Sequence, residues 1–296
     1  MSVLLCPVCK QSLASDESQK RWCCENNHSF DRARQGYLNL LLSHKKKSKN
    51  PGDSQEMVIA RQEFLNSNFY RPISDTLNQL VVEKLFQLPE GQKYLLDIGC
   101  GEGYYTQRLQ DSLNDHLINH TLYGLDISKD AVLAAAKRSK AQALVQEKSN
   151  DEPSSKIEWL VASGIDMPIE ANSIDIATCL FTRLMPESYQ QVLKKDGLLI
   201  CVTTGEEHLI ELRRYLYDEI KPTYFKPENT LAEHFELISQ QPVKYQNTLE
   251  NQQQIQNLLL MTPHQWRTRA DNREAVKALE SLTVTVDAQI SIFKTL

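Results

Sequence analysis

The chain has 296 residues, of which 41% are hydrophobic and 24% charged, and this composition is typical of a globular protein. It excludes a collagen-like, intrinsically disordered or disulfide-scaffold protein. The longest apolar runs, such as 38–42, are far shorter than the roughly 20 residues that a membrane span needs, and the N-terminus lacks the pattern of a secretory signal. We therefore expect a cytoplasmic protein with one large domain, one small domain and no membrane partner.

The net charge of −5 is distributed unevenly along the chain. Residues 1–50 carry nine lysines and arginines against four acids, a net charge of +5, whereas the rest of the chain sums to −10. A basic segment on an acidic body favours an anionic partner such as nucleic acid, although a solvated tail would have the same composition. The segment ends in a run of basic residues: Lys45, Lys46, Lys47 and Lys49. Pro51 and Gly52 follow, which is typical of an exposed linker that neutralises phosphates, or simply of a solubilising hinge.

Four of the seven cysteines lie within the first 24 residues. They include a C-x2-C pair, followed fourteen residues later by a C-x3-H pair, so the predicted metal ligands are Cys6, Cys9, Cys24 and His28. Two local pairs of sulfur and nitrogen donors predict a closed, tetrahedral and therefore structural zinc site, while reduced cysteines without a metal are the simpler alternative. Cys23 could take the place of Cys24 as a metal ligand. We favour Cys24, because Trp22 and Cys23 are predicted to end a strand.

Strands and helices alternate from about residue 93 onwards. An apolar run ends in Asp97 and leads into a turn that contains Gly99, Gly101 and Gly103. A second strand ends in Asp126, an acid at the position that binds ribose hydroxyls in nucleotide-binding folds. The alternation predicts an α/β fold with a doubly wound parallel sheet whose ligand lies at the carboxyl ends of the central strands. Helices are predicted over 54–66, 71–87, 103–113, 130–143 and 187–194, and further strands over 157–162, 174–181 and 198–204.

The glycine turn fits two kinds of cofactor. A dinucleotide site needs a third glycine where this chain has Tyr104. The pattern Asp97-Ile-Gly-Cys-Gly-Glu-Gly103 instead resembles the first motif of class I S-adenosylmethionine-dependent methyltransferases. That resemblance implies that Asp97 and the three glycines surround the methionine part of the cofactor, that Asp126 binds its ribose, and that Ser163 lies near its adenine.

Over residues 6–269 the chain resembles the bacterial 23S rRNA (guanine-N1)-methyltransferase family. Its matching blocks are Cys6-Pro-Val-Cys9, Gly36-Tyr37-x-Asn39-Leu40, Pro51-Gly-Asp-Ser54, Leu96-Asp-Ile-Gly-Cys-Gly-Glu-Gly-Tyr-Tyr-Thr106, His208-Leu-x-Glu-Leu212 and Met261-Thr-Pro263-x-x-Trp266-Arg267-x-Arg269. The resemblance implies zinc at the Cys/His quartet and cofactor contacts at Tyr70, Gly101, Glu102 and His208. We expect a zinc-ribbon-like domain over 1–40, a basic linker over 41–53, and a methyltransferase domain over 54–296 with a mostly parallel, Rossmann-like sheet of seven strands.

The implied reaction transfers the methyl group of S-adenosylmethionine to N1 of a guanine in a hairpin loop of 23S rRNA. Guanine N1 carries a proton at neutral pH and is occupied in a base pair, so the reaction needs a base and an unpaired or flipped target. Asp53, Glu187 and His208 are candidates for the base, and we choose Asp53, whose alternative role is to cap the helix that follows it. The rival functions are methylation of tRNA or of a small molecule, and a non-catalytic zinc and RNA-binding protein.

Contacts to RNA are predicted at aromatic and basic side chains. Phe181 and Trp266 could stack on a splayed base or could simply pack in a core. Arg61 and Arg267 could hold phosphates or form surface ion pairs. The family often has an aromatic, a small residue and Pro-Cys where this chain has Phe181-Thr-Arg-Leu184, and the insert over 144–155 is predicted to be an exposed loop. The sequence leaves open whether two copies form a homodimer.

Overall fold

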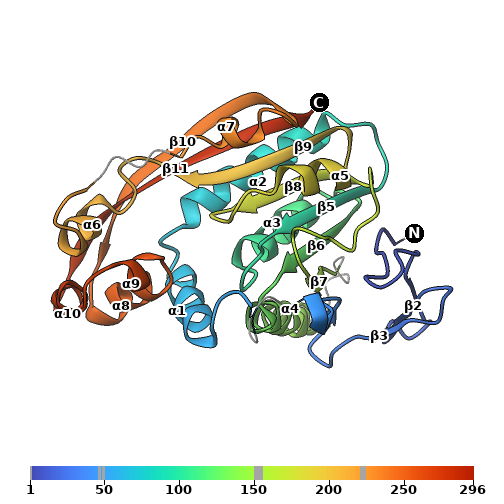
Figure 1. The fold of residues 1–296 in the computed structure, drawn as a ribbon, viewed down its shortest axis with the longest axis horizontal. Coiled ribbons are helices and arrows are strands. Elements are labelled where there is room, and N and C mark those ends of the chain that lie inside the picture. The colour runs from blue at the N-terminus through green and yellow to red at the C-terminus, as the bar shows by residue number, and fades with distance from the viewer. Residues whose placement is uncertain (1, 46–47, 49–50, 150–155, 221–224) are drawn as a thin grey trace.

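The computed structural model describes residues 2–45, 48, 51–149, 156–220 and 225–296. An eight-stranded sheet crosses the molecule in the order β10-β11-β9-β8-β5-β6-β7-β4. A small three-stranded sheet near the N-terminus lies at one end of the molecule, and the helices α6, α8, α9 and α10 gather at the other (Figure 1). No helix in the described ranges is long and apolar enough to cross a membrane.

The centre of the large sheet is parallel, and β11 is the one strand of the described sheet that runs in the opposite direction, since it pairs antiparallel with both β9 and β10. This is the doubly wound α/β class expected from the alternation of strands and helices. The parallel strands are β5 (Lys93–Ile98), β6 (His120–Asp126), β7 (Glu158–Val161), β8 (Ile174–Leu180) and β9 (Leu193–Thr204). Beyond β9, the reversed strand β11 (Leu282–Thr295) is followed at the edge by β10 (Phe235–Leu249), which again runs in the direction of the central strands.

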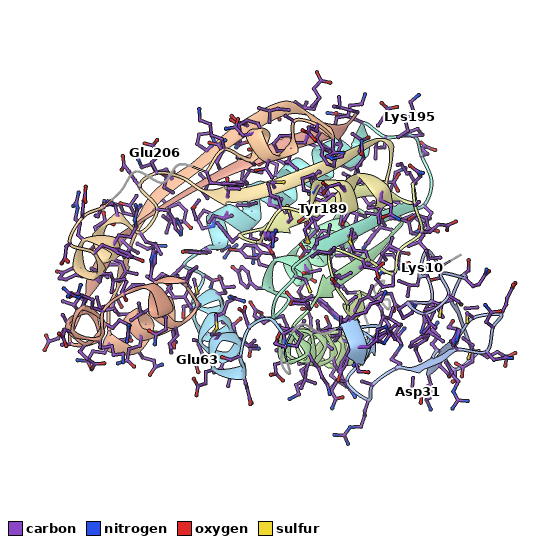
Figure 2. The ribbon with its side chains drawn as sticks, viewed as in Figure 1. Lys10, Asp31, Glu63, Tyr189, Lys195 and Glu206 are labelled. Atoms are coloured by element: carbon purple, nitrogen blue, oxygen red, sulfur yellow. The ribbon has the colours of Figure 1, made fainter. Side chains whose placement is uncertain are left out.

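Hydrophobic cores cover the sheet on both faces, because consecutive side chains of a strand point to opposite sides. Leu95 belongs to the core that contains the helices α2 and α3, whereas Leu96 belongs to the core that contains the N-terminal module. Figure 2 shows Tyr189 inside the molecule, on α5, where its side chain is fully buried in the second of these cores. The helices are α1 (Gln55–Asn66), α2 (Arg71–Phe86), α3 (Tyr104–Asp115), α4 (Lys129–Ser149), α5 (Pro186–Val192), α6 (Ile210–Leu216), α7 (Pro227–Leu231), α8 (Gln252–Leu260), α9 (His264–Arg267) and α10 (Ala270–Lys277).

The N-terminal module, residues 2–45, is built onto the large sheet. Its small sheet consists of β1 (Ala14–Ser15), β2 (Arg21–Cys23) and β3 (Ser29–Asp31), and a short 3-10 helix, η1, spans Ser43–Lys45. Its last strand, β4 (Tyr37–Asn39), pairs in parallel with β7 and adds an eighth strand to the seven expected. Three residues cannot signal a strand by themselves, so this pairing depends on the tertiary contacts of the module. The segment assigned to a separate zinc domain therefore ends inside the sheet of the cofactor domain.

Two predicted boundaries move in the structure. Helix α4 continues to Ser149, so the first part of the insert predicted as a loop is helical, and residues 150–155 lie outside the described ranges. Strand β9 begins at Leu193, so it takes over the end of the helix predicted to reach residue 194. The apolar run Leu198–Val202 is the buried part of that strand. The polar residues before it are more exposed, and in the sequence they resemble the last turn of a surface helix.

Candidate functional site

The glycine turn lies between the carboxyl end of β5 and the start of α3. All three of its glycines have positive φ, between 55° and 82°, where side chains are strained. A Cβ atom on Gly103 would lie 2.7 Å from Ala135 Cβ, and one on Gly99 would lie 2.9 Å from Thr182 Oγ1. At Gly101, by contrast, the nearest described atom to a Cβ position is Arg61 Nη1, at 3.6 Å. Two of the glycines are thus packed against other parts of the chain, whereas beside Gly101 no described atom other than Arg61 Nη1 is recorded within 4 Å of the Cβ position.

Asp97 supports this turn from inside the sheet. Its carboxylate accepts hydrogen bonds from Thr106 Oγ1 at 2.5 Å and from Thr178 Oγ1 at 2.8 Å, and burial raises its pKa to about 6. These contacts occupy the carboxylate with the protein's own hydroxyl groups. Thr178 is a site residue that the sequence analysis missed, since a single threonine inside an apolar strand carries no local signal.

Asp126 ends β6 beside the turn. Its carboxylate accepts hydrogen bonds from the backbone nitrogens of Gly101, at 3.0 Å, and Ser128, at 2.8 Å. Burial raises the pKa of this carboxyl group. The acid predicted to bind ribose hydroxyls therefore lies directly against the glycine turn, at the carboxyl edge of the parallel strands.

The segment that contains Asp53 lies across this edge. Ser54, and not Asp53, caps helix α1, because the Ser54 hydroxyl accepts from the Met57 backbone nitrogen. The alternative role of Asp53 as a helix cap is therefore wrong. Its carboxylate forms an ion pair with Arg61, and its carbonyl oxygen accepts a hydrogen bond from Ser128 Oγ at 2.9 Å.

Three aromatic rings contact one another around Phe181, whose neighbour Thr182 faces Gly99 of the turn. The Tyr70 hydroxyl lies 3.2 Å from His208 Nε2, and Phe181 stacks on His208 with ring centroids 6.2 Å apart. Phe181 is 39% exposed and has a left-handed backbone conformation, with φ of 52°, at the end of β8. Its exposure leaves the ring accessible to a ligand, and a contact between Phe181 and a base stays a prediction.

Glu102 and Ser163 are placed less directly toward a cofactor. The Glu102 side chain is buried and its carboxylate accepts a hydrogen bond from Arg138 Nη2 at 2.7 Å, so its backbone is the part left to meet a ligand. Ser163 is half-buried in the loop after β7, where its hydroxyl accepts from the Ile165 backbone nitrogen at 3.3 Å. Their contacts to the cofactor remain predictions.

The four predicted zinc ligands come together in the N-terminal module. The ligand atoms of Cys6, Cys9, Cys24 and His28 all lie within 4.8 Å of one another, with Cys24 Sγ 3.3 Å from His28 Nδ1 and 3.6 Å from Cys9 Sγ. These separations suit a tetrahedron of sulfur and nitrogen around zinc, whose bonds are about 2.0–2.3 Å long. Cys23 is exposed on β2 and outside the quartet, so Cys24 and not Cys23 lies where a fourth ligand is needed.

The basic residues predicted to bind RNA are distributed differently from the expectation. Lys45 forms an ion pair with Asp166, which Lys10 also contacts at 2.5 Å, so these lysines help to hold the module on the loop after β7 (Figure 2 labels Lys10). Arg61 lies at the glycine turn. Lys46, Lys47 and Lys49 lie outside the described residues, and so do the side chains of Trp266 and Arg267 on α9.

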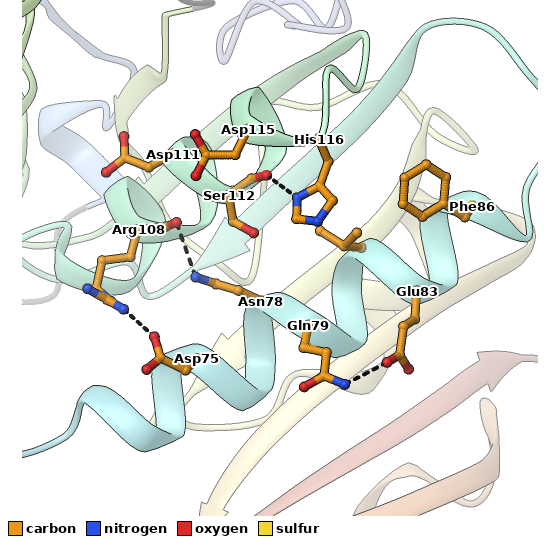
Figure 3. A pocket seen from close by; sticks show the side chains of 11 residues that line it. Asp75, Asn78, Gln79, Glu83, Phe86, Arg108, Asp111, Ser112, Asp115 and His116 are labelled. Carbon is orange, nitrogen blue, oxygen red and sulfur yellow. Dashed lines mark hydrogen bonds and ion pairs between the residues drawn. The ribbon is translucent and has the colours of Figure 1, made fainter.

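A cavity of about 620 Å³ lies away from these groups, between α2 and α3. Four of its eleven lining residues are acidic, including Asp111 and Asp115, and Arg108 pairs with Asp75 at one end (Figure 3). The predicted site residues do not line it. It therefore belongs to the helical face of the sheet and not to the carboxyl edge where the glycine turn lies.

Comparisons with known proteins agree with the two-part site. Residues 4–49 match the family model described as RlmA, N-terminal, and residues 96–201 match the one described as Methyltransferase domain. A protein of Bacillus subtilis (strain 168), provisionally named 23S rRNA (guanine-N(1)-)-methyltransferase YxjB, is 31% identical over 98% of this chain and 96% of its own length. The 23S rRNA (guanine(748)-N(1))-methyltransferase of Streptomyces fradiae is 29% identical over 90% of this chain and 87% of its own.

A third relative matches about half of this chain. The demethylmenaquinone methyltransferase of Bacillus pumilus (strain SAFR-032) is 27% identical over 48% of this chain and 56% of its own length. The chain belongs to the 23S rRNA (guanine-N1)-methyltransferase family and is an S-adenosylmethionine-dependent enzyme with a structural zinc site.

Proposed function

We propose that this chain transfers the methyl group of S-adenosylmethionine to N1 of an unpaired guanine in a hairpin loop of 23S rRNA. The observation that carries the proposal is that the zinc module and the cofactor turn share one sheet. Strand β4 of the module pairs with β7, and β7 pairs with β6, which ends at Asp126 beside the glycine turn. RNA held on the module would therefore have a fixed position relative to the methyl donor.

The residues at the carboxyl edge divide the work of binding and positioning. S-Adenosylmethionine supplies a methyl group that is already activated by its sulfonium. The space over Gly101 receives the methionine part, Asp126 binds the ribose, and the Ser163 loop borders the adenine. Phe181 offers an exposed ring at the rim on which a splayed guanine can stack. Alignment of the base with the donor then accounts for most of the catalysis.

Asp53 is the group that we propose as general base. His208 is unsuited to that role, because its Nδ1 accepts a hydrogen bond from the Asp287 backbone nitrogen and its Nε2 lies against the Tyr70 hydroxyl. Glu187 is 79% exposed on α5, where His234 lies 4.0 Å away. Asp53 alone among the three candidates lies between Arg61 and Ser128, beside the glycine turn.

We also propose that RNA phosphates compete with Asp166 for the lysines of the module. Lys10 and Lys45 are each about 40–50% exposed in their ion pairs with Asp166. Surface pairs of this kind contribute little free energy, so a phosphate can displace the carboxylate at low cost. The basic linker would then continue the path of the RNA backbone.

The experiment is mass-spectrometric mapping of methylguanine in 23S rRNA from cells that lack this gene and from the complemented strain. We expect one N1-methylguanine in a hairpin loop to disappear and to return on complementation. Purified enzyme with labelled donor should then modify an rRNA fragment that carries that loop. Unchanged rRNA in the deletion strain, with labelled tRNA or a labelled small molecule in extracts, would instead support the rival substrates.

A further inference from the structure

Arg61 closes a ring of contacts around the open space at the glycine turn. Arg61 pairs with the Asp53 carboxylate, the Asp53 carbonyl accepts from Ser128 Oγ, and the Ser128 backbone nitrogen donates to Asp126. Asp126 in turn accepts from the Gly101 nitrogen, and the Cβ position of Gly101 faces Arg61 Nη1 at 3.6 Å. The ring joins four separate segments: the strap before α1, helix α1, the glycine turn and the end of β6.

The charges in and beside this ring are mostly negative. Asp53, Asp97, Asp126 and Glu102 contribute four carboxyl groups, and the nearby cation Arg138 is already paired with Glu102. S-Adenosylmethionine carries a sulfonium, an ammonium and a carboxylate, a net charge of +1. Acids suit the two cationic groups of this ligand, but its carboxylate needs a cation within the same small space.

We infer that the Arg61 guanidinium binds the α-carboxylate of the methionine part of S-adenosylmethionine. A planar guanidinium presents several donors to a carboxylate, and such charge-assisted hydrogen bonds are shorter and stronger than neutral ones. Arg61 is held in place for this contact from two sides, by Asp53 and by the carbonyl oxygen of Met261, which lies 3.4 Å from Nη2. The inference deepens the proposed function, because it assigns a residue to the donor of that reaction.

This assignment replaces the prediction that Arg61 holds an RNA phosphate. Only 24% of its side chain is exposed. An RNA phosphate would bring a further negative charge to a place that contains several carboxylates. The amino-acid part of the donor brings its own ammonium and sulfonium, which offset those charges.

Calorimetric titration with two ligands that differ by one group tests the inference. The ligands are S-adenosylmethionine and its decarboxylated form, and the proteins are the wild type and Arg61→Met. We expect the substitution to weaken binding of S-adenosylmethionine roughly 10- to 100-fold and to change binding of the decarboxylated ligand by less than about 3-fold. Arg71→Met is the matched control. Arg71 and Asp75 both lie on the next helix, α2, where they form an exposed ion pair.

The other outcomes are also decisive. Equal loss for both ligands would mean that Arg61 only supports the fold of the pocket and would overturn the inference. Unchanged binding of both ligands, with weaker rRNA binding, would restore the phosphate role and overturn it as well. If Arg61→Met does not fold, Arg61→Lys keeps the charge without the fork and should lose part of the preference for the carboxylated ligand. A wild type that binds neither ligand would contradict the proposed function itself.

Discussion

Tyr70 and His208 are in direct contact, with the Tyr70 hydroxyl 3.2 Å from His208 Nε2. The contact fixes the state of the imidazole. Because Nδ1 accepts a hydrogen bond from the Asp287 backbone nitrogen, the ring proton is on Nε2 and points to the tyrosine oxygen. Burial lowers the pKa of His208 to about 4, so the ring is neutral at physiological pH and acts as a fixed wall of the site.

The depressed pKa of His208 predicts a specific dependence of stability on pH. Unfolded His208 takes up a proton near pH 6.5, whereas the folded ring does so only near pH 4. The unfolded state therefore binds more protons in this window, and the free energy of unfolding falls as the pH decreases from 6.5 to 4, by at most about 3 kcal/mol from this group. Urea unfolding of wild type and His208→Gln across this range should give curves that diverge, with the steeper loss in the wild type. Parallel curves would show that the imidazole titrates normally.

The two neighbouring cysteines of β2 and its turn provide a matched test of the zinc centre. Cys24 lies in the quartet and Cys23 is exposed outside it. We expect Cys24→Ser to lose bound zinc and several kilocalories of stability, because the module depends on metal to hold its turns together, whereas Cys23→Ser should keep one zinc per chain. Elemental analysis and thermal unfolding measure both. Full zinc content in Cys24→Ser would transfer the ligand role to another residue.

The exposed ring of Phe181 should contribute to the reaction and not to stability. We expect Phe181→Ala to lower kcat/KM for rRNA roughly 5- to 100-fold, because stacking of a base on an aromatic ring is worth about 1–3 kcal/mol. Affinity for S-adenosylhomocysteine and the thermal midpoint should change little, since the ring is 39% exposed. Phe86→Ala, on the exposed face of α2, is the control and should leave the rRNA kinetics unchanged.

Equal loss of rRNA activity and cofactor affinity in Phe181→Ala would count against stacking. It would indicate that the ring packs on the cofactor through His208 instead. Phe181→Gly adds a check on the backbone, since glycine adopts the positive φ of this position without strain.

Local signals predicted the parts of the site that depend on local geometry. The C-x2-C and C-x3-H pairs predicted the four side chains that the structure brings together, because each pair lies within one tight turn. The glycine turn could be predicted in the same way. A side chain at Gly103, for example, would collide with Ala135 and Trp159, so the position requires a glycine. The fold class followed from the alternation of strands and helices around these motifs.

Features that depend on contacts between distant segments could not be predicted. Strand β4 exists because it pairs with β7 more than a hundred residues away. Strand β10 is mostly exposed and contains Pro242, so its sequence lacks the alternation that marks a buried strand. The same reason explains Arg61, which reads as a surface cation in sequence but meets Asp53 and the glycine turn in the fold.

Asp53→Asn tests the proposed general base. The substitution keeps the shape of the side chain but removes its ability to take the N1 proton, so we expect kcat for rRNA methylation to fall about 10²- to 10⁴-fold. Binding of S-adenosylhomocysteine should weaken only a few-fold, because the Asp53 carbonyl still accepts from Ser128 and the strap stays in place.

A substitution at the neighbouring helix cap is the control that distinguishes the loss of a base from the loss of local structure. Ser54→Ala removes the hydrogen bond to the Met57 nitrogen and should lower the stability of α1 by about 1 kcal/mol with only a small effect on kcat. In single-turnover assays, the chemical step should be slow in Asp53→Asn and close to the wild-type rate in Ser54→Ala. A wild-type single-turnover rate in Asp53→Asn would show that another group accepts the proton, since the two proteins differ only in the carboxyl group beside Arg61.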